Sequence, residues 1–161
     1  MLKGLFGNRQ ARRDDAEMGK GVWRRAHDRF RRGLDRFHQM LEGISTDARA
    51  DPALLDSYDA IVPLANELAD LLPRVRALAT AAQATAPSEG TDIPASAGGY
   101  LNDVHRELSR AGNALATAAE AVAMVRLGAG GLDAVERRSR IVAGHVARAQ
   151  ELFDAQQATD K

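Results

Sequence analysis

A run of large side chains between residues 23 and 44 constrains the fold of this chain more than any other feature of its sequence. The side chains recur at alternating intervals of four and three residues, the spacing of one face of a helix that packs against other helices. The positions are Trp23, His27, Phe30, Leu34, Phe37, Leu41 and Ile44. This face holds the only tryptophan and two of the four phenylalanines, so other helices must cover it. The expected core anchors are Trp23, Phe30, Leu34, Phe37 and Leu41.

Three further segments repeat this spacing. The helices are predicted over residues of about 19–44, 52–84, 100–127 and 132–156. Asp51 followed by Pro52 is typical of an N-cap and a first helical residue. Pro63 and Pro73 lie inside the second helix, and the spacing continues across both prolines, so we expect a bent but continuous helix there.

Four helices with two short connections and one longer connection predict an all-α protein, an antiparallel up-down-up-down four-helix bundle with heptad-type seams. The bundle is expected to form one domain over residues 19–157, after a basic, flexible segment at 1–18 and before a tail at 158–161. The connection at 85–99 is rich in Pro, Gly, Ser and Ala and is expected to be a mobile loop. An extended first helix would project from the bundle and meet this loop at the same end.

Motifs for catalysis or metal binding are lacking in the sequence. The chain has no cysteine, so disulfides, thiolate metal sites and cysteine nucleophiles are excluded. The four histidines fall at different heights along the predicted helices, and no nucleophile elbow or phosphate-binding loop occurs. His27 interrupts the apolar face, either as a hydrogen-bonded core histidine or as a polar residue that fixes the register. We expect a protein that is not an enzyme and has no cofactor or metal.

The charges are distributed unevenly although the net charge is zero. The first forty residues carry an excess of basic side chains, and the remainder carries the compensating acidic excess. Four arginines lie opposite the apolar face of the first predicted helix and form a candidate interaction surface: Arg25, Arg29, Arg32 and Arg36. They are interpreted as a solvated helix face that pairs with acidic residues of the second helix, or as a contact for a protein, an anionic membrane or nucleic-acid phosphates. Asp28 and Asp35 neutralise part of the stripe, which argues against nucleic acid.

The first thirteen residues combine apolar and basic side chains. The candidate membrane contacts are Leu2, Leu5, Phe6, Arg9, Arg12 and Arg13. They form either a frayed terminus or a short basic amphipathic segment that contacts anionic lipid. No stretch has the length and apolarity of a signal peptide or a membrane span, so we expect a cytoplasmic protein. It would be located at the inner face of the membrane if this amphipathic segment binds lipid. The abundance of arginine and alanine suggests a bacterial genome rich in GC.

These features predict an interaction or scaffold protein built on a helical bundle, whose partner is another protein or a second copy of the chain. The first alternative is a peripheral membrane module that uses the basic N-terminus. The second is a nucleic-acid binder that contacts phosphates through the arginine stripe without reading the base sequence.

Overall fold

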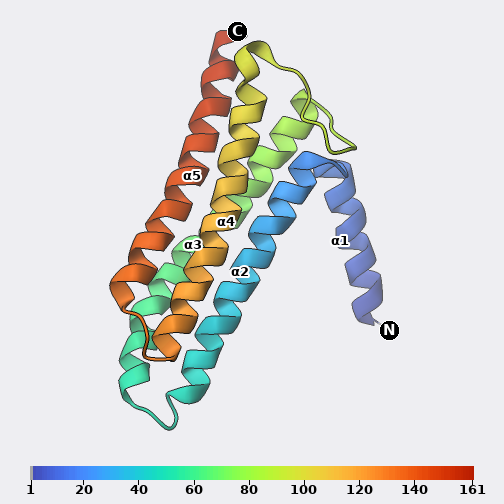
Figure 1. The fold of residues 1–161 in the computed structure, drawn as a ribbon. Coiled ribbons are helices and arrows are strands. Elements are labelled where there is room, and N and C mark those ends of the chain that lie inside the picture. Colours follow the sequence, from blue (N-terminus) through green and yellow to red (C-terminus); the bar gives the residue numbers. More distant parts are fainter. Residues whose placement is uncertain (1) are drawn as a thin grey trace.

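The computed structural model describes the backbone of residues 2–161 and the side chains from residue 4 onward. In this part the chain forms five α-helices and one short 3-10 helix (Figure 1). They are α1 (Leu2–Met18), α2 (Val22–Asp47), α3 (Ala53–Thr85), η1 (Ala97–Gly99), α4 (Tyr100–Arg126) and α5 (Leu132–Thr159). The predicted all-α class is confirmed. The prediction counted four helices, and the additional one is α1, which occupies the segment predicted to be flexible; its flexibility stays a prediction.

Helices α2 to α5 pack around one core, and the chain alternates in direction from one helix to the next (Figure 1). Helix α2 packs against α3 and α4, and α5 packs against the same two helices, so that α2 and α5 lie diagonally across the core. Consequently α2 and α4 are neighbours that run in the same direction, and so are α3 and α5. The sequence predicted a bundle in which all neighbouring helices are antiparallel. Two pairs of neighbours are parallel instead, so the predicted arrangement is not the one observed.

The connection between α3 and α4 explains the order of the helices. It crosses the first turn of α2, where the backbone amide of Val22 donates to Ser88 Oγ at 3.2 Å and the indole Nε1 of Trp23 donates to the carbonyl of Ala86 at 3.1 Å. The contact is so close that a Cβ atom on Gly21 would lie 2.2 Å from the carbonyl oxygen of Ser88. Because the connection is tied to α2, the chain enters α4 beside α2 rather than beside α3.

The core is built on the large side chains of α2. Trp23, Phe30 and Phe37 are fully buried, and Leu34 and Leu41 are also buried, as the spacing of the sequence leads one to expect. Small residues bring α4 close to this face, since a Cβ atom on Gly33 would meet the side chain of Leu115 and one on Gly112 would meet that of Arg29. Each of these glycines thus permits a closer approach of two parallel helices.

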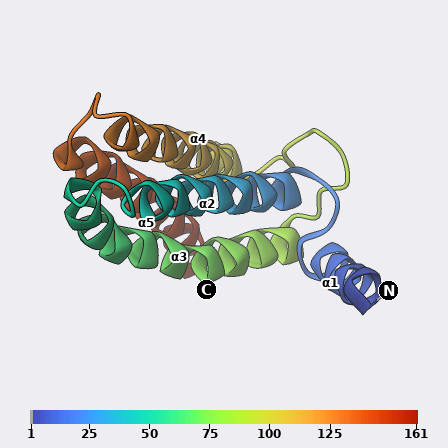
Figure 2. The ribbon, with the colours of Figure 1, turned by 90° about the horizontal axis from the view of Figure 1, so that it is seen from below.

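Helix α3 continues without interruption past both of its internal prolines and follows a curved course (Figure 2). Its first turn is stabilised by Asp51, whose Oδ1 accepts a hydrogen bond from the backbone amide of Ala53 at 3.1 Å. Each proline removes one internal hydrogen bond and bends the helix without ending it. The bent, continuous helix expected from the sequence is the one observed.

The chain reverses direction between α1 and α2. Gly19 has a φ of +70°, and its backbone amide donates to the carbonyl of Asp15 at 3.0 Å, which ends α1 with a left-handed residue. Helix α1 then lies back beside α2 and α3 rather than extending α2 beyond the end of the bundle (Figure 1). The predicted projecting first helix is therefore wrong, although the N-terminal turn and the connection after α3 do meet at Ser88.

Candidate functional site

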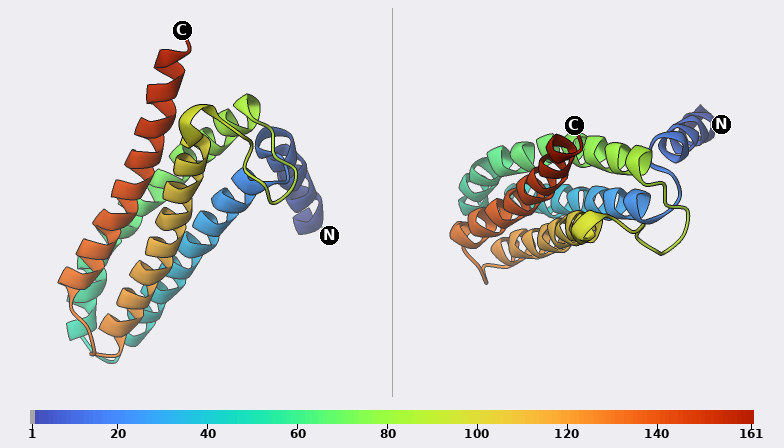
Figure 3. Two further views of the ribbon diagram at one scale, coloured as in Figure 1. Left: turned by 45° about the horizontal axis from the view of Figure 1, so that its top comes forward. Right: turned by 90° about the horizontal axis from the view of Figure 1, so that it is seen from above.

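Helix α1 is an arm that is attached to the rest of the protein near its C-terminal end. Met18 is fully buried and Asp14 is 2% exposed, whereas the side chains from Gly4 to Arg13 are exposed. Figure 3 shows that the axis of α1 diverges from the other helices. The arm therefore depends on contacts in its last two turns with α2 and α3.

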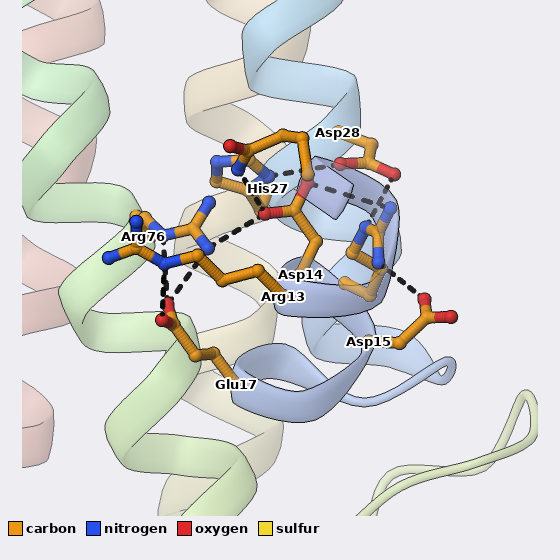
Figure 4. Close-up of polar contacts among 9 residues, drawn as sticks. Arg13, Asp14, Asp15, Glu17, His27, Asp28 and Arg76 are labelled. Carbon is orange, nitrogen blue, oxygen red and sulfur yellow. Dashed lines mark hydrogen bonds and ion pairs between the residues drawn. The ribbon is translucent and has the colours of Figure 1, made fainter. Parts of the chain in front are cut away.

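A cluster of five charged side chains makes this attachment. We name it the clasp, and it consists of Asp14, Asp15 and Glu17 of α1, Arg24 of α2 and Arg76 of α3. Figure 4 labels four of them, Asp14, Asp15, Glu17 and Arg76. Arg76 Nη2 lies 2.7 Å from Asp14 Oδ1 and 2.8 Å from Glu17 Oε2. Arg24 Nη1 lies 2.7 Å from Asp15 Oδ1, and its Nη2 lies 3.7 Å from Asp14 Oδ2. Each arginine thus bridges two carboxylates of α1, and Asp14 joins both arginines.

Further hydrogen bonds extend from the clasp. Gln10 Nε2 donates to Asp14 Oδ1 at 2.7 Å. Arg24 Nε donates to Asp28 Oδ2 at 2.9 Å, and the other oxygen of Asp28 lies 3.0 Å from Nδ1 of His27. The network therefore connects α1 to a histidine on the core-facing side of α2.

The electrostatic environment keeps the clasp charged. Burial alone would raise the pKa of Asp14, but hydrogen bonds from Arg76 and Gln10 and the positive charges of Arg76 and Arg24 hold that pKa below its ordinary value. Burial would likewise lower the pKa of Arg76, whereas its bonds to Glu17 and Asp14 raise it. At neutral pH both partners are ionised, and their hydrogen bonds are of the charge-assisted kind.

His27 is a hydrogen-bonded histidine of the core and is 3% exposed. Burial lowers its pKa below the ordinary value of 6.5, an effect that Asp28 offsets only in part. Burial also lowers the pKa of His105, and the charges of Arg29 and Arg25 lower it further. Both imidazoles are therefore neutral in the folded protein at pH 7.

We expect the free energy of unfolding to decrease as the pH falls below about 6.5. In this range the unfolded chain binds protons at His27 and His105 that the folded chain does not bind, so protonation favours unfolding. Urea unfolding followed by the fluorescence of Trp23 at pH 8 and pH 5 measures the effect. The variants His27→Gln and His105→Gln should each reduce the difference between the two pH values. An unchanged difference in both variants would assign it to other groups.

The side of α1 that faces away from α2 and α3 carries the predicted membrane contacts. At about 100° per residue, the positions of Leu5, Phe6, Arg9, Arg12 and Arg13 fall within an arc of about 120°. The centre of this arc lies roughly opposite the buried Asp14 and Met18. Leu5 is 63% exposed and Phe6 is 65% exposed, and the three arginines are exposed as well. The side chain of Leu2, the sixth predicted contact, lies outside the described residues.

The four arginines of the predicted interaction surface are all exposed on α2, but they lie in two environments. Arg25 and Arg29 line a pocket against α4, where the guanidinium of Arg25 donates to the carbonyl of Gly90. Arg32 and Arg36 lie further along α2 and outside this pocket. Within the side chains described, none of the four forms an ion pair, so the interpretation that they pair with acidic residues of the second helix is wrong.

In residues 2–161, no group of three or more His, Asp or Glu side chains is placed to hold a metal ion. His145 Nδ1 lies 2.7 Å from Glu107 Oε2, and Arg110 Nη1 lies 2.8 Å from Glu107 Oε1. The contact between His145 and Glu107 joins α4 to α5. No helix of the described chain has an apolar stretch long enough to span a membrane.

The clasp was not predicted from the sequence. One signal was present, because Asp14, Asp15 and Glu17 follow a basic run and directly precede the turn at Gly19. Nothing in the sequence distinguished Arg76 from the other arginines, since it meets α1 only through the tertiary fold.

No protein-family model, curated protein or solved structure matches this chain.

Proposed function

We propose that this protein is a non-enzymatic interaction module that binds an anionic membrane surface through the outer side of α1. In this proposal α2 to α5 form a four-helix bundle with heptad-type seams, which is the body of the module, and α1 is its attachment arm. The single observation that supports it most is the outer side of α1, on which two large apolar side chains and three arginines are exposed together.

The composition of this side fits a lipid surface. Residues 4–13 contain three arginines and no acidic residue, so the exposed part of α1 is complementary in charge to an anionic bilayer. Leu5 and Phe6 lie one to two turns before the arginines, where they can enter the boundary between head groups and acyl chains. Each basic residue near such a surface contributes about 1 kcal/mol, and burial of a leucine or phenylalanine contributes about 1.5–3 kcal/mol.

The ion pairs of the clasp are compatible with the proposal. Asp14 and Asp15 are engaged with Arg76 and Arg24 and pair with none of the outer arginines in the described structure, whereas Glu17 pairs with both Arg76 and Arg13. Among the side chains from residue 4 onward, Arg13 is the one outer arginine that forms an ion pair, with Glu17 at 2.9 Å. Arg9 and Arg12 remain available for lipid phosphates.

We expect the full-length protein to float with anionic liposomes at low salt and to stay in solution with neutral ones. Arg9→Gln combined with Arg12→Gln should weaken binding about 30-fold, which corresponds to two charges at about 1 kcal/mol each. Leu5→Ser combined with Phe6→Ser should abolish flotation at physiological salt, because screening then leaves too little attraction. Flotation with anionic, neutral and mixed vesicles measures both effects.

The matched control is Arg32→Gln combined with Arg36→Gln, which removes the same charge from exposed positions on α2. It should leave flotation unchanged. Equal losses in the two double variants would show a diffuse electrostatic effect and contradict a specific role for α1. A protein that stays in solution with every vesicle would overturn the proposal, and light scattering would then test the alternative of self-association.

A further inference from the structure

A pocket with both polar and apolar lining residues lies between α2, α4 and the connection that precedes α4. It takes no part in the proposed contact of α1 with lipid. It has a volume of about 200 Å³, and its polar side chains are Arg25 and Arg29 of α2, Thr91 of the connection, and His105 and Ser109 of α4. Each of the three segments thus contributes at least one hydrogen-bonding side chain to the same small space.

The positive charge of this pocket is not neutralised by a partner. Arg25 and Arg29 form no ion pair within the described side chains, whereas Arg24, the neighbour of Arg25 in sequence, is bound to three carboxylates on the other side of α2. The guanidinium of Arg25 is held toward the connection by its bond to the carbonyl of Gly90. The aliphatic stem of Arg29 lies against Gly112, where a Cβ atom would come within 3.1 Å of it. Arg25 and Arg29 therefore both line one cavity, and each side chain carries several hydrogen-bond donors.

His105 adds a third nitrogen group in a defined orientation. Its ring packs edge-on against Trp23, with ring centroids 5.9 Å apart and an interplanar angle of 71°. Trp23 is itself held in place by the bond from its Nε1 to the carbonyl of Ala86. Burial lowers the pKa of His105, and the positive charges of Arg29 and Arg25 lower it further, so both arginines act on the imidazole at this site.

We propose that this pocket binds the phosphate group of a small phosphorylated molecule. The two guanidinium groups supply paired donors of the geometry that phosphate oxygens accept, and the hydroxyls of Thr91 and Ser109 and the ring of His105 supply the remaining bonds. The pocket has the volume of about seven water molecules at about 30 Å³ each, which is sufficient for a tetrahedral anion.

An adjoining hollow indicates where the rest of the molecule would lie. This hollow has a volume of about 570 Å³, shares His105 and Ser109 with the pocket, and continues along the first turns of α4 past Asn102 and Arg106. Its one acidic residue, Asp103, is paired with Arg106 at 3.1 Å. A polar substituent on the phosphate would therefore meet neutral or paired groups.

The test is a titration of the full-length protein with glycerol 3-phosphate, with glycerol as the uncharged control. Calorimetry measures the affinity, and the fluorescence of Trp23 reports the site because this is the only tryptophan and it touches His105. We expect saturable binding of glycerol 3-phosphate and none of glycerol. Arg25→Gln combined with Arg29→Gln should weaken binding at least about tenfold, since charge-assisted bonds to phosphate are lost. Arg32→Gln combined with Arg36→Gln should leave the affinity unchanged.

Two further measurements distinguish this site from general attraction and from α1. Nuclear magnetic resonance of the imidazole should show that bound phosphate raises the pKa of His105, an effect that a purely structural role of the arginines would not produce. Arg9→Gln combined with Arg12→Gln should not change the affinity for glycerol 3-phosphate, so failure of the membrane proposal would leave this one intact. If vesicles that contain phosphatidic acid bind through Arg25 and Arg29 while glycerol 3-phosphate does not, the phosphate belongs to a lipid head group. The absence of saturable binding to both probes up to about 10 mM phosphate would overturn the inference.

Discussion

Phe30→Ala is expected to lower the free energy of unfolding by about 3–5 kcal/mol. Phe30 is fully buried on the face of α2 that the other helices cover. Truncation removes most of the apolar surface of the side chain and leaves a cavity, because the backbones of packed helices relax only in part. Urea unfolding followed by the fluorescence of Trp23 measures the change as a lower midpoint with an unchanged slope.

Phe6→Ala provides a control with the same chemical change on an exposed helix. Phe6 is 65% exposed, so its truncation should alter the free energy of unfolding by no more than about 0.5 kcal/mol. A similar loss in both variants would contradict the assignment of Phe30 to the core and of Phe6 to the outer side of α1.

The apolar spacing of the sequence predicted four of the five helices, with ends that differ by no more than about three residues from those observed. This spacing shows which side of a helix is buried but not which helix covers it. The parallel contact of α2 with α4 depends on Gly33 and Gly112 and on the connection tied to Ser88. These contacts join residues that are distant in sequence, so a pattern read along the chain does not contain them.

The helical conformation of α1 was not predicted, for a different reason. Its apolar residues show no repeat over three or more turns, and a run that includes Gly4 and Gly7 has a low intrinsic tendency to form a helix. Its stability comes from pairs four residues apart, such as Arg13 with Glu17, and from tertiary ion pairs with Arg76, which lies 59 residues after Glu17. The sequence identified the composition of the outer side of α1, but the fold was needed to show that this side faces away from the bundle.

The spacing along the chain also did not show the tertiary surroundings of the arginines of α2. Their four-and-three spacing placed Arg25, Arg29, Arg32 and Arg36 on one stripe, and all four are exposed. The division of the stripe into two pairs comes from the connection, which brings Thr91 beside the first pair only. Helix periodicity assigned one role to four residues that occupy two environments.

Asp14→Ala is expected to weaken the attachment of α1 by about 1.5–3 kcal/mol, because it removes the charge-assisted hydrogen bond of a buried carboxylate to Arg76. Arg76 keeps Glu17 and Arg24 keeps Asp15 as a partner in this variant. Asp14 is 2% exposed and is the only carboxylate that contacts both arginines of the clasp in the described structure. Since α1 is held by its last two turns, the loss should appear as local opening rather than as global unfolding. Hydrogen exchange should become faster in α1 and stay unchanged in the protected amides of α2 to α5.

Asp15→Ala makes the same change one residue later, at a side chain that is 41% exposed and contacts Arg24 alone. Exposed ion pairs contribute less than about 1 kcal/mol, so exchange in α1 should barely change in this variant. Equal effects of the two substitutions would show that α1 is held by its overall charge rather than by the buried Asp14.

The Asp14→Ala variant should still float with anionic vesicles, because Leu5, Phe6 and the arginines of the outer side do not depend on the clasp for their exposure. In that variant the vesicle would hold α1 while the α2 to α5 body moves freely, so hydrogen exchange in α1 should slow again when lipid is added.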